Sequence, residues 1–141
     1  MKRLNLFKTF VLMAASMLMF SSCQKDPEEL LVGKWIVVSS VEEYFHNGES
    51  KDVVHNEQVG LIHDYREDGT LVVDFGDETL EVLYWTYADD VITLSETSTF
   101  ADYIDLHVDL LEEEHLEISF IEDVGNGGSV NGKWQLYHQN Q

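Results

Sequence analysis

The sequence predicts an all-β fold, an eight-stranded antiparallel up-and-down barrel preceded by a short helical turn. Three observations lead to this prediction. Apolar and polar residues alternate along most segments after Gly33, which is the period of a half-buried strand. Short turns rich in Gly, Asp and Asn separate these segments. No stretch has a helical period long enough for a crossover, so consecutive strands pair antiparallel, and eight of them can close on themselves.

Residues 26–33 predict one short helix ahead of the first strand. Asp26 is a typical N-cap, Pro27 fits the first helical position, and Glu29 lies three residues after the cap. Residues 30–32 add one apolar turn, and Gly33 ends the helix. We expect this apolar turn to close one end of the barrel.

The first strand is predicted over residues 34–45, with Trp35, Val37, Ser39 and Val41 on one face. Residues 46–58 interrupt it with turn-forming residues and form the longest connection that we expect in the chain. The other seven strands follow at shorter spacing, over residues 60–66, 70–75, 79–87, 91–94, 100–111, 115–121 and 133–138.

The first 22 residues have the features of a secretory signal peptide. Lys2, Arg3 and Lys8 give a basic start, and the apolar run from Phe10 to Phe20 is too short for an ordinary membrane-spanning helix. We therefore predict a signal peptide over residues 1–22, a tether over residues 23–29 and a barrel domain over residues 30–141.

Cys23 is the only cysteine and directly follows two serines at the end of this run. The sequence Phe20-Ser21-Ser22-Cys23 resembles the lipobox of bacterial lipoproteins, where cleavage leaves the cysteine first and its sulfur is acylated, for example with palmitate. The resemblance implies that Cys23 anchors the chain in a membrane, and two or more acyl chains make such an anchor stable. A plain signal peptide cut elsewhere is the alternative.

Residues 24–29, a lysine followed by acidic residues, resemble the surface-export signal of one group of Gram-negative bacteria. Together the two resemblances imply an outer-membrane lipoprotein of the cell envelope that is displayed on the cell surface. A solvated tether without an export role is the alternative interpretation of these six residues.

The mature chain is strongly acidic. The whole sequence has 8 Lys and Arg against 27 Asp and Glu, for a formal net charge of −19, and loss of Lys2, Arg3 and Lys8 with the signal peptide leaves −22. Such a surface repels phosphate backbones, so nucleic acid is excluded as a partner. Its simplest role is solubility beside a crowded envelope.

A helical turn followed by Gly33-x-Trp35 at the start of an eight-stranded meander resembles the first signature of the lipocalin and calycin barrels. Residues 67–70 and Trp85, shortly before an Ala-Asp-Asp turn, resemble small lipocalin-like domains of bacterial surface lipoproteins, and the similarity spans residues 30–138. The resemblance implies that Trp35 packs across the closed end of the barrel. Larger lipocalins stack an arginine near the last strand on this tryptophan, whereas here the only mature arginine is Arg66.

The barrel interior is the first candidate binding site. An aromatic wall with a few polar groups suits a small apolar ligand with one polar end. The alternation predicts the following residues for this tentative site: Trp35, Leu61, His63, Tyr65, Phe75, Leu83, Trp85 and Tyr87. The competing interpretation is that these large side chains simply fill the barrel.

The alternative function is a surface module that binds an envelope protein or a glycan through its loops, above all residues 46–58. We expect no catalytic site and no cofactor, because the chain has no nucleophile motif and its glycine-rich residues 125–128 have no helix or lysine beside them. We expect no metal site, because its six histidines form no ligand pairs at helical or alternate spacing.

Overall fold

The structure, a computed structural model, describes residues 25–139; the predicted signal peptide and Cys23 lie outside these residues. The described part contains one helix, α2 (Pro27–Leu31), and otherwise strands. The strands are β1 (Gly33–His46), β2 (Glu49–His55), β3 (Ile62–Tyr65), β4 (Thr70–Asp74), β5 (Leu80–Ala88), β6 (Val91–Ser95), β7 (Ile104–Leu111), β8 (His115–Gly125) and β9 (Gly128–His138).

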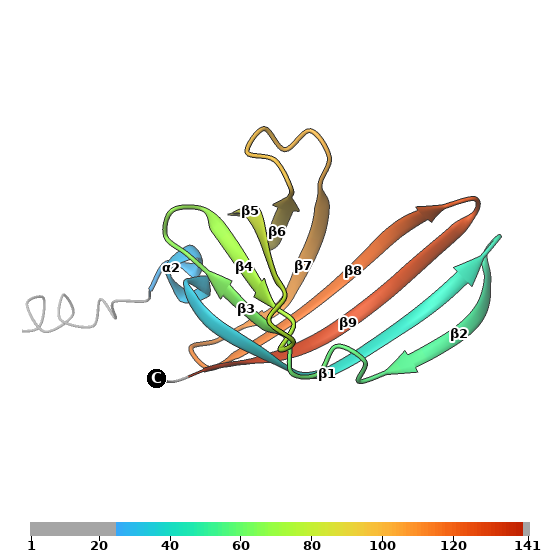
Figure 1. Ribbon diagram of the computed structural model, residues 1–141, viewed down its shortest axis with the longest axis horizontal. Helices are drawn as coiled ribbons and strands as arrows, with labels where there is room; N and C mark the ends of the chain where they lie inside the picture. The colour runs from blue at the N-terminus through green and yellow to red at the C-terminus, as the bar shows by residue number, and fades with distance from the viewer. Residues whose placement is uncertain (1–24, 140–141) are drawn as a thin grey trace, which may run out of the picture.

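The sheet closes on itself. Its order is β2-β1-β3-β4-β5-β6-β7-β8-β9, all described pairs are antiparallel, and a further pairing of β1 with β9 shuts the ring. Eight strands therefore form the barrel, which confirms the predicted fold class, and β2 is an additional strand outside it. The far halves of β1, β8 and β9, with β2 alongside, extend past the other strands as an arm (Figure 1).

The connection predicted over residues 46–58 is wrong in part, because it contains β2. Asn47 and Gly48 both have positive φ angles, 53° and 79°, and form a tight two-residue turn that sends the chain back along β1. Asn126 and Gly127 repeat this geometry, so β9 begins at Gly128 and not near residue 133. The two Asn-Gly turns thus extend strands that the sequence analysis ended too early.

The inward face of β1 changes at Val38. Trp35 and Val37 are buried, but the β1–β9 register then shifts between Val37 and Ser39. Such a bulge moves the following side chains to the opposite face. The prediction that Ser39 and Val41 share the face of Trp35 is therefore wrong, and the buried residues beyond the bulge are Ser40 and Glu42.

Helix α2 closes one end of the barrel, as we expected. The Asp26 side chain accepts a hydrogen bond from Glu28 N at 3.1 Å, and Leu31 is fully buried. Trp35 Nε1 donates to the Leu31 carbonyl at 2.8 Å, so the indole binds the last helical turn directly. The capped helix and the first strand are thereby held as one unit.

His138 on β9 occupies the outer side of the Trp35 ring. The two rings meet edge to face, with their centroids 5.0 Å apart. Gly33 has a φ of +136°, and a Cβ there would collide with the His138 ring. A glycine is therefore required at this point, and an aromatic contact from β9 covers the tryptophan.

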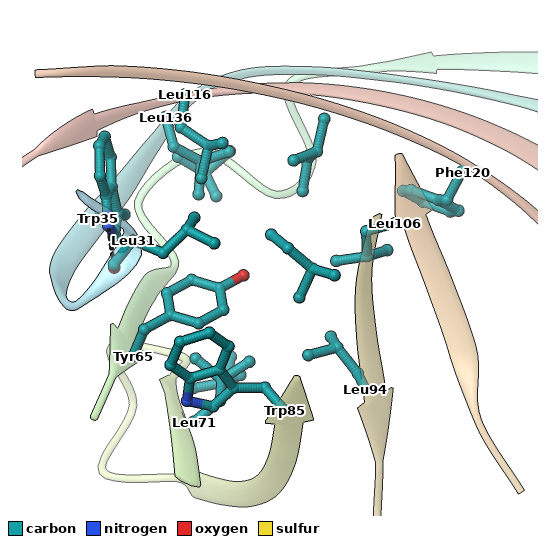
Figure 2. Packing of buried hydrophobic residues seen from close by; sticks show 14 of the residues in the cluster. Leu31, Trp35, Tyr65, Leu71, Trp85, Leu94, Leu106, Leu116, Phe120 and Leu136 are labelled. Atoms are coloured by element: carbon teal, nitrogen blue, oxygen red, sulfur yellow. Dashed lines mark hydrogen bonds between the residues drawn. The ribbon is translucent and has the colours of Figure 1, made fainter. Parts of the chain in front are cut away.

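The apolar core fills the closed end and the middle of the barrel. Figure 2 shows Leu31, Trp35, Tyr65, Leu71 and Trp85 grouped on one side of the interior. Further buried residues continue this cluster toward the other end: Val37, Val73, Ile92, Leu94, Leu106, Leu116, Ile118, Phe120, Val130 and Leu136. The closed end is consequently a packed core with little room for a ligand.

We predict that Trp35→Phe lowers the free energy of unfolding by about 2–4 kcal/mol, because it removes the bond to the Leu31 carbonyl and leaves a void in the core. Chemical denaturation measures the change. Val38→Ala on the same strand is the matched control, since Val38 is 41% exposed. It is expected to cost less than about 1 kcal/mol, and equal losses in the two variants would contradict this role for Trp35.

Candidate functional site

A pocket of about 410 Å³ opens to solvent at the end of the barrel opposite helix α2. This volume falls in the lower part of the usual range for small-molecule sites, about 300–1,000 Å³. One wall comes from the arm formed by β1, β8 and β9, and the other from strands β3 to β7. The apolar side chains of its wall include Leu61, Val73, Leu83, Leu94, Leu106 and Val130.

Glu42 on β1 places a carboxylate in the wall of this pocket. Glu42 is only 5% exposed, and each of its oxygens accepts one hydrogen bond. Trp134 Nε1 donates to Oε1 at 3.0 Å, and the Tyr44 hydroxyl donates to Oε2 at 3.0 Å. This bond to Glu42 is the main reason why the pKa of Tyr44 is raised. Both donors are neutral, so they orient the carboxylate without balancing its charge.

His63 on β3 adds a second polar group to the lining of the same pocket. Its side chain is 3% exposed, and its Nδ1 has no hydrogen-bond partner among the described residues. Burial lowers the pKa of His63 to about 4, so the ring is neutral at physiological pH. The His63 ring meets the Trp134 ring edge to face, with centroids 5.7 Å apart, so Trp134 is a neighbour of both Glu42 and His63.

Aromatic rings line the pocket beside Glu42 and His63. Phe120 on β8 meets Trp134 edge to face at a centroid distance of 5.3 Å, and Phe75 lies at the mouth, 43% exposed. Gly132 lies opposite both Glu42 on β1 and Phe120 on β8. A Cβ at Gly132 would collide with the far end of the Phe120 ring, so this glycine leaves the space that the ring occupies.

The residues of the tentative interior site divide into two groups. The pocket is lined by Leu61, His63, Phe75 and Leu83. The other four lie elsewhere: Trp35, Tyr65 and Trp85 belong to the packed core, and Tyr87 donates to Asp90 at the surface near the closed end. The structure thus brings together half of this set, and no ligand contact is assigned to the rest.

Tyr65 and Trp85 illustrate the difference between core and pocket. Trp85 Nε1 donates to the carbonyls of Arg66 and Thr70, both at 3.1 Å, so its polar atom is fully used. The Tyr65 hydroxyl has no partner among the described residues and points toward the middle of the interior (Figure 2). Burial raises the pKa of Tyr65, so this hydroxyl stays neutral.

Three residues of the pocket wall were not predicted from the sequence: Glu42, Tyr44 and Trp134. The bulge at Val38 reverses the alternation on β1, so a simple period of two places Glu42 and Tyr44 outside. The sequence does contain one sign of this bulge, the run Ile36-Val37-Val38. Three successive apolar residues break the alternation expected of a strand with one buried face. Trp134 lies on the strand predicted over residues 133–138, for which no inward face was predicted.

Other parts of the described chain offer less. Two hollows of about 590 and 550 Å³ flank helix α2, outside the barrel, and exposed residues such as Lys25, Asp26 and Glu28 form much of their walls.

Within residues 25–139, no three His, Cys, Asp or Glu side chains are placed to hold a metal ion. Asp105, His107 and Asp109 lie on the exposed face of β7. Among the described residues, no helix has the length and apolarity needed to span a membrane.

Compared with known proteins, the chain matches no protein-family model and no curated sequence. The pocket is therefore the feature of the chain that indicates its function.

We predict that His63 makes the protein less stable in acid. Its pKa is about 6.5 when unfolded and about 4 when folded, so the unfolded chain binds the extra proton between these values. Stability from neutral His63 is complete above pH 6.5 and is lost as the pH falls toward 4. The total is about 3 kcal/mol relative to His63→Gln.

Denaturation curves from pH 7 to pH 4 on both proteins measure this difference, and the acidic surface affects both equally. His107→Gln is the control, because His107 is exposed on β7. It should follow the unmodified chain throughout. Parallel curves for the His63 variant and the unmodified chain would contradict a buried, neutral His63.

Proposed function

We propose that this protein is a non-enzymatic binder of a small, largely apolar ligand, which it holds in the open end of its barrel. The observation that carries the proposal is the 410 Å³ pocket, whose wall combines aliphatic and aromatic side chains with a few buried polar groups. His63 lines this pocket, and its Nδ1 has no hydrogen-bond partner among the described residues.

Nile red, a neutral apolar dye, tests this function. We predict that its fluorescence rises on binding to the full chain, and that Leu83→Trp weakens binding at least about tenfold because the indole fills the pocket. The matched control is Val82→Trp on the same strand, since Val82 is 57% exposed and does not line the pocket. This variant should bind within about twofold of the unmodified chain.

Two results would contradict the proposal. The first is no binding of Nile red to the folded, unmodified chain, and the second is equal loss of binding in both tryptophan variants. Either result would favour the alternative, a surface module that binds an envelope protein or a glycan. Denaturation midpoints of the variants show whether each one folds.

We further propose that Cys23 carries the lipid anchor of an outer-membrane lipoprotein with a lipocalin-type barrel. The basis is the lipobox-like sequence at residues 20–23. Cys23 lies four residues before Pro27, where helix α2 begins, so at most about 14 Å of chain separates them. Because α2 is at the closed end, an anchored barrel presents its pocket away from the lipid surface.

Growth with labelled palmitate tests the anchor. We predict that the unmodified chain is labelled and fractionates with membranes, whereas Cys23→Ala is unlabelled, because the chain has no other cysteine. Ser22→Ala is the control and should be labelled normally, since a small residue remains before Cys23. An unlabelled wild-type chain would contradict the anchor and leave the binding function untouched.

A further inference from the structure

The charges that line the pocket restrict the class of ligand more closely than its apolar side chains do. Three carboxylates line it: Glu42 within the wall, and Glu81 and Glu122, both exposed, at the rim. No Lys or Arg among the described residues lines the pocket. All five cationic residues from Lys25 onward lie elsewhere in a chain with 27 carboxylates. The potential inside the pocket is therefore negative, which disfavours an anionic head group.

Glu42 is arranged to accept a further donor. Its two known partners, Trp134 Nε1 and the Tyr44 hydroxyl, use one acceptor position on each oxygen. A carboxylate has about four such positions, so two remain. Removing a carboxylate from water costs several kcal/mol unless a charge and enough hydrogen bonds compensate it. The described residues supply the hydrogen bonds but no cation beside Glu42, and a bound cation would fill that role.

His63 gives independent support, because it is a buried polar group with an unused atom in the same pocket. His63 lines this pocket and is 3% exposed, and its Nδ1 has no hydrogen-bond partner among the described residues. A neutral imidazole has one nitrogen that accepts, which suits an N–H donor on a ligand. Trp134 contacts both groups, through its N–H at Glu42 and its ring at His63, so both border the same corner.

The aromatic side chains of this corner favour the same ligand chemistry. The rings of Tyr44, Phe75, Phe120 and Trp134 line the pocket. Ring faces carry partial negative charge and attract cations, by about 0.5–2 kcal/mol each. Aliphatic residues deeper in the pocket, such as Leu83 and Leu106, suit an apolar body. The pocket thus has apolar walls that suit an acyl chain, but the position beside Glu42 favours a positively charged head group.

We propose that the pocket selects a small organic amine in its protonated form, with the ammonium group between Glu42 and His63 and the apolar body against Phe120 and Leu83. The ammonium donates to the free acceptor positions of the Glu42 carboxylate, and the neutral His63 ring lines the pocket beside it. This inference rests on the proposed binding function and specifies the ligand class. It also separates this barrel from a carrier of fatty acids, whose carboxylate would face Glu42 without a cation.

Three probes with one body and different head groups test the proposal: 4-phenylbutylamine, 4-phenylbutanol and 4-phenylbutyrate. At pH 7 the first is a cation, the second is neutral and the third is an anion. We predict that the full chain binds the amine at least about tenfold more tightly than the acid, with the alcohol between them. Isothermal titration calorimetry measures all three affinities, and Nile red displacement places them in the pocket.

Glu42→Gln identifies the group responsible. It keeps the shape and an acceptor oxygen but removes the charge, so the amine should lose about tenfold in affinity while the alcohol changes less than about threefold. Glu43→Gln is the matched control, since it removes the same charge from the next position on β1 and does not line this pocket. Its affinities should equal those of the unmodified chain.

The outcomes separate the two proposals. Binding of the acid as tightly as the amine by the unmodified chain would overturn the amine proposal and leave the binding function in place. If Nile red fails to bind, the binding function itself is overturned, and if Nile red binds but the amine does not, only the amine proposal is overturned. The comparison of probes on the unmodified chain decides the ligand class even if Glu42→Gln fails to fold.

Discussion

The pairing of β1 with β9 is the constraint on which the rest of the structure depends. It closes the sheet, and it runs along nearly the whole of β1, from Trp35 opposite His138 to His46 opposite Gly128. The register shift after Val37 divides this pairing into two parts with opposite inward faces. The first part directs Trp35 into a packed core, and the second directs Glu42 into the pocket. One bulge thus gives the barrel a closed end and a polar, open end.

The buried side chains differ in how well their polar atoms are satisfied. The indole nitrogens of Trp35 and Trp85 both donate to backbone carbonyls. His63 Nδ1 and the Tyr65 hydroxyl have no partners among the described residues. An unsatisfied buried polar group costs about 1–3 kcal/mol. A stable fold tolerates this cost most readily where burial elsewhere is extensive, and here the packed end supplies that burial.

The fold could be predicted from the sequence because it depends on local signals that this chain carries in most places. Alternation and short turns gave the strands, and the Asp26-Pro27 start gave the helix. The errors fall where a local signal had two meanings. Asn47-Gly48 was interpreted as the start of a long loop, but a turn with two positive φ angles continues a sheet as a hairpin. Strand β2 and the arm were missed for this reason.

The position of Glu42 in the pocket could not be predicted from the sequence for a different reason. His63 was predicted because it lies on a strand without a bulge, where period two holds. Glu42 was not, because its position follows the shift at Val38, and a glutamate is ordinarily placed on the solvent face. Its burial becomes explicable only when Gly132 on β9 and the Trp134 indole are known to lie beside it. Those contacts join residues about ninety positions apart, which no local pattern encodes.

The position of the pocket relates one acidic residue of this chain to ligand binding. Spread over the surface, the excess of carboxylates serves solubility and says nothing about a ligand. Glu42 differs from the others because it is buried, held at both oxygens by neutral donors and placed beside open volume. Low-dielectric walls strengthen its field relative to an exposed carboxylate. The exposed carboxylates at the rim also make the potential in the pocket more negative. The charge of the whole domain and that of the buried group therefore both favour a cationic head group.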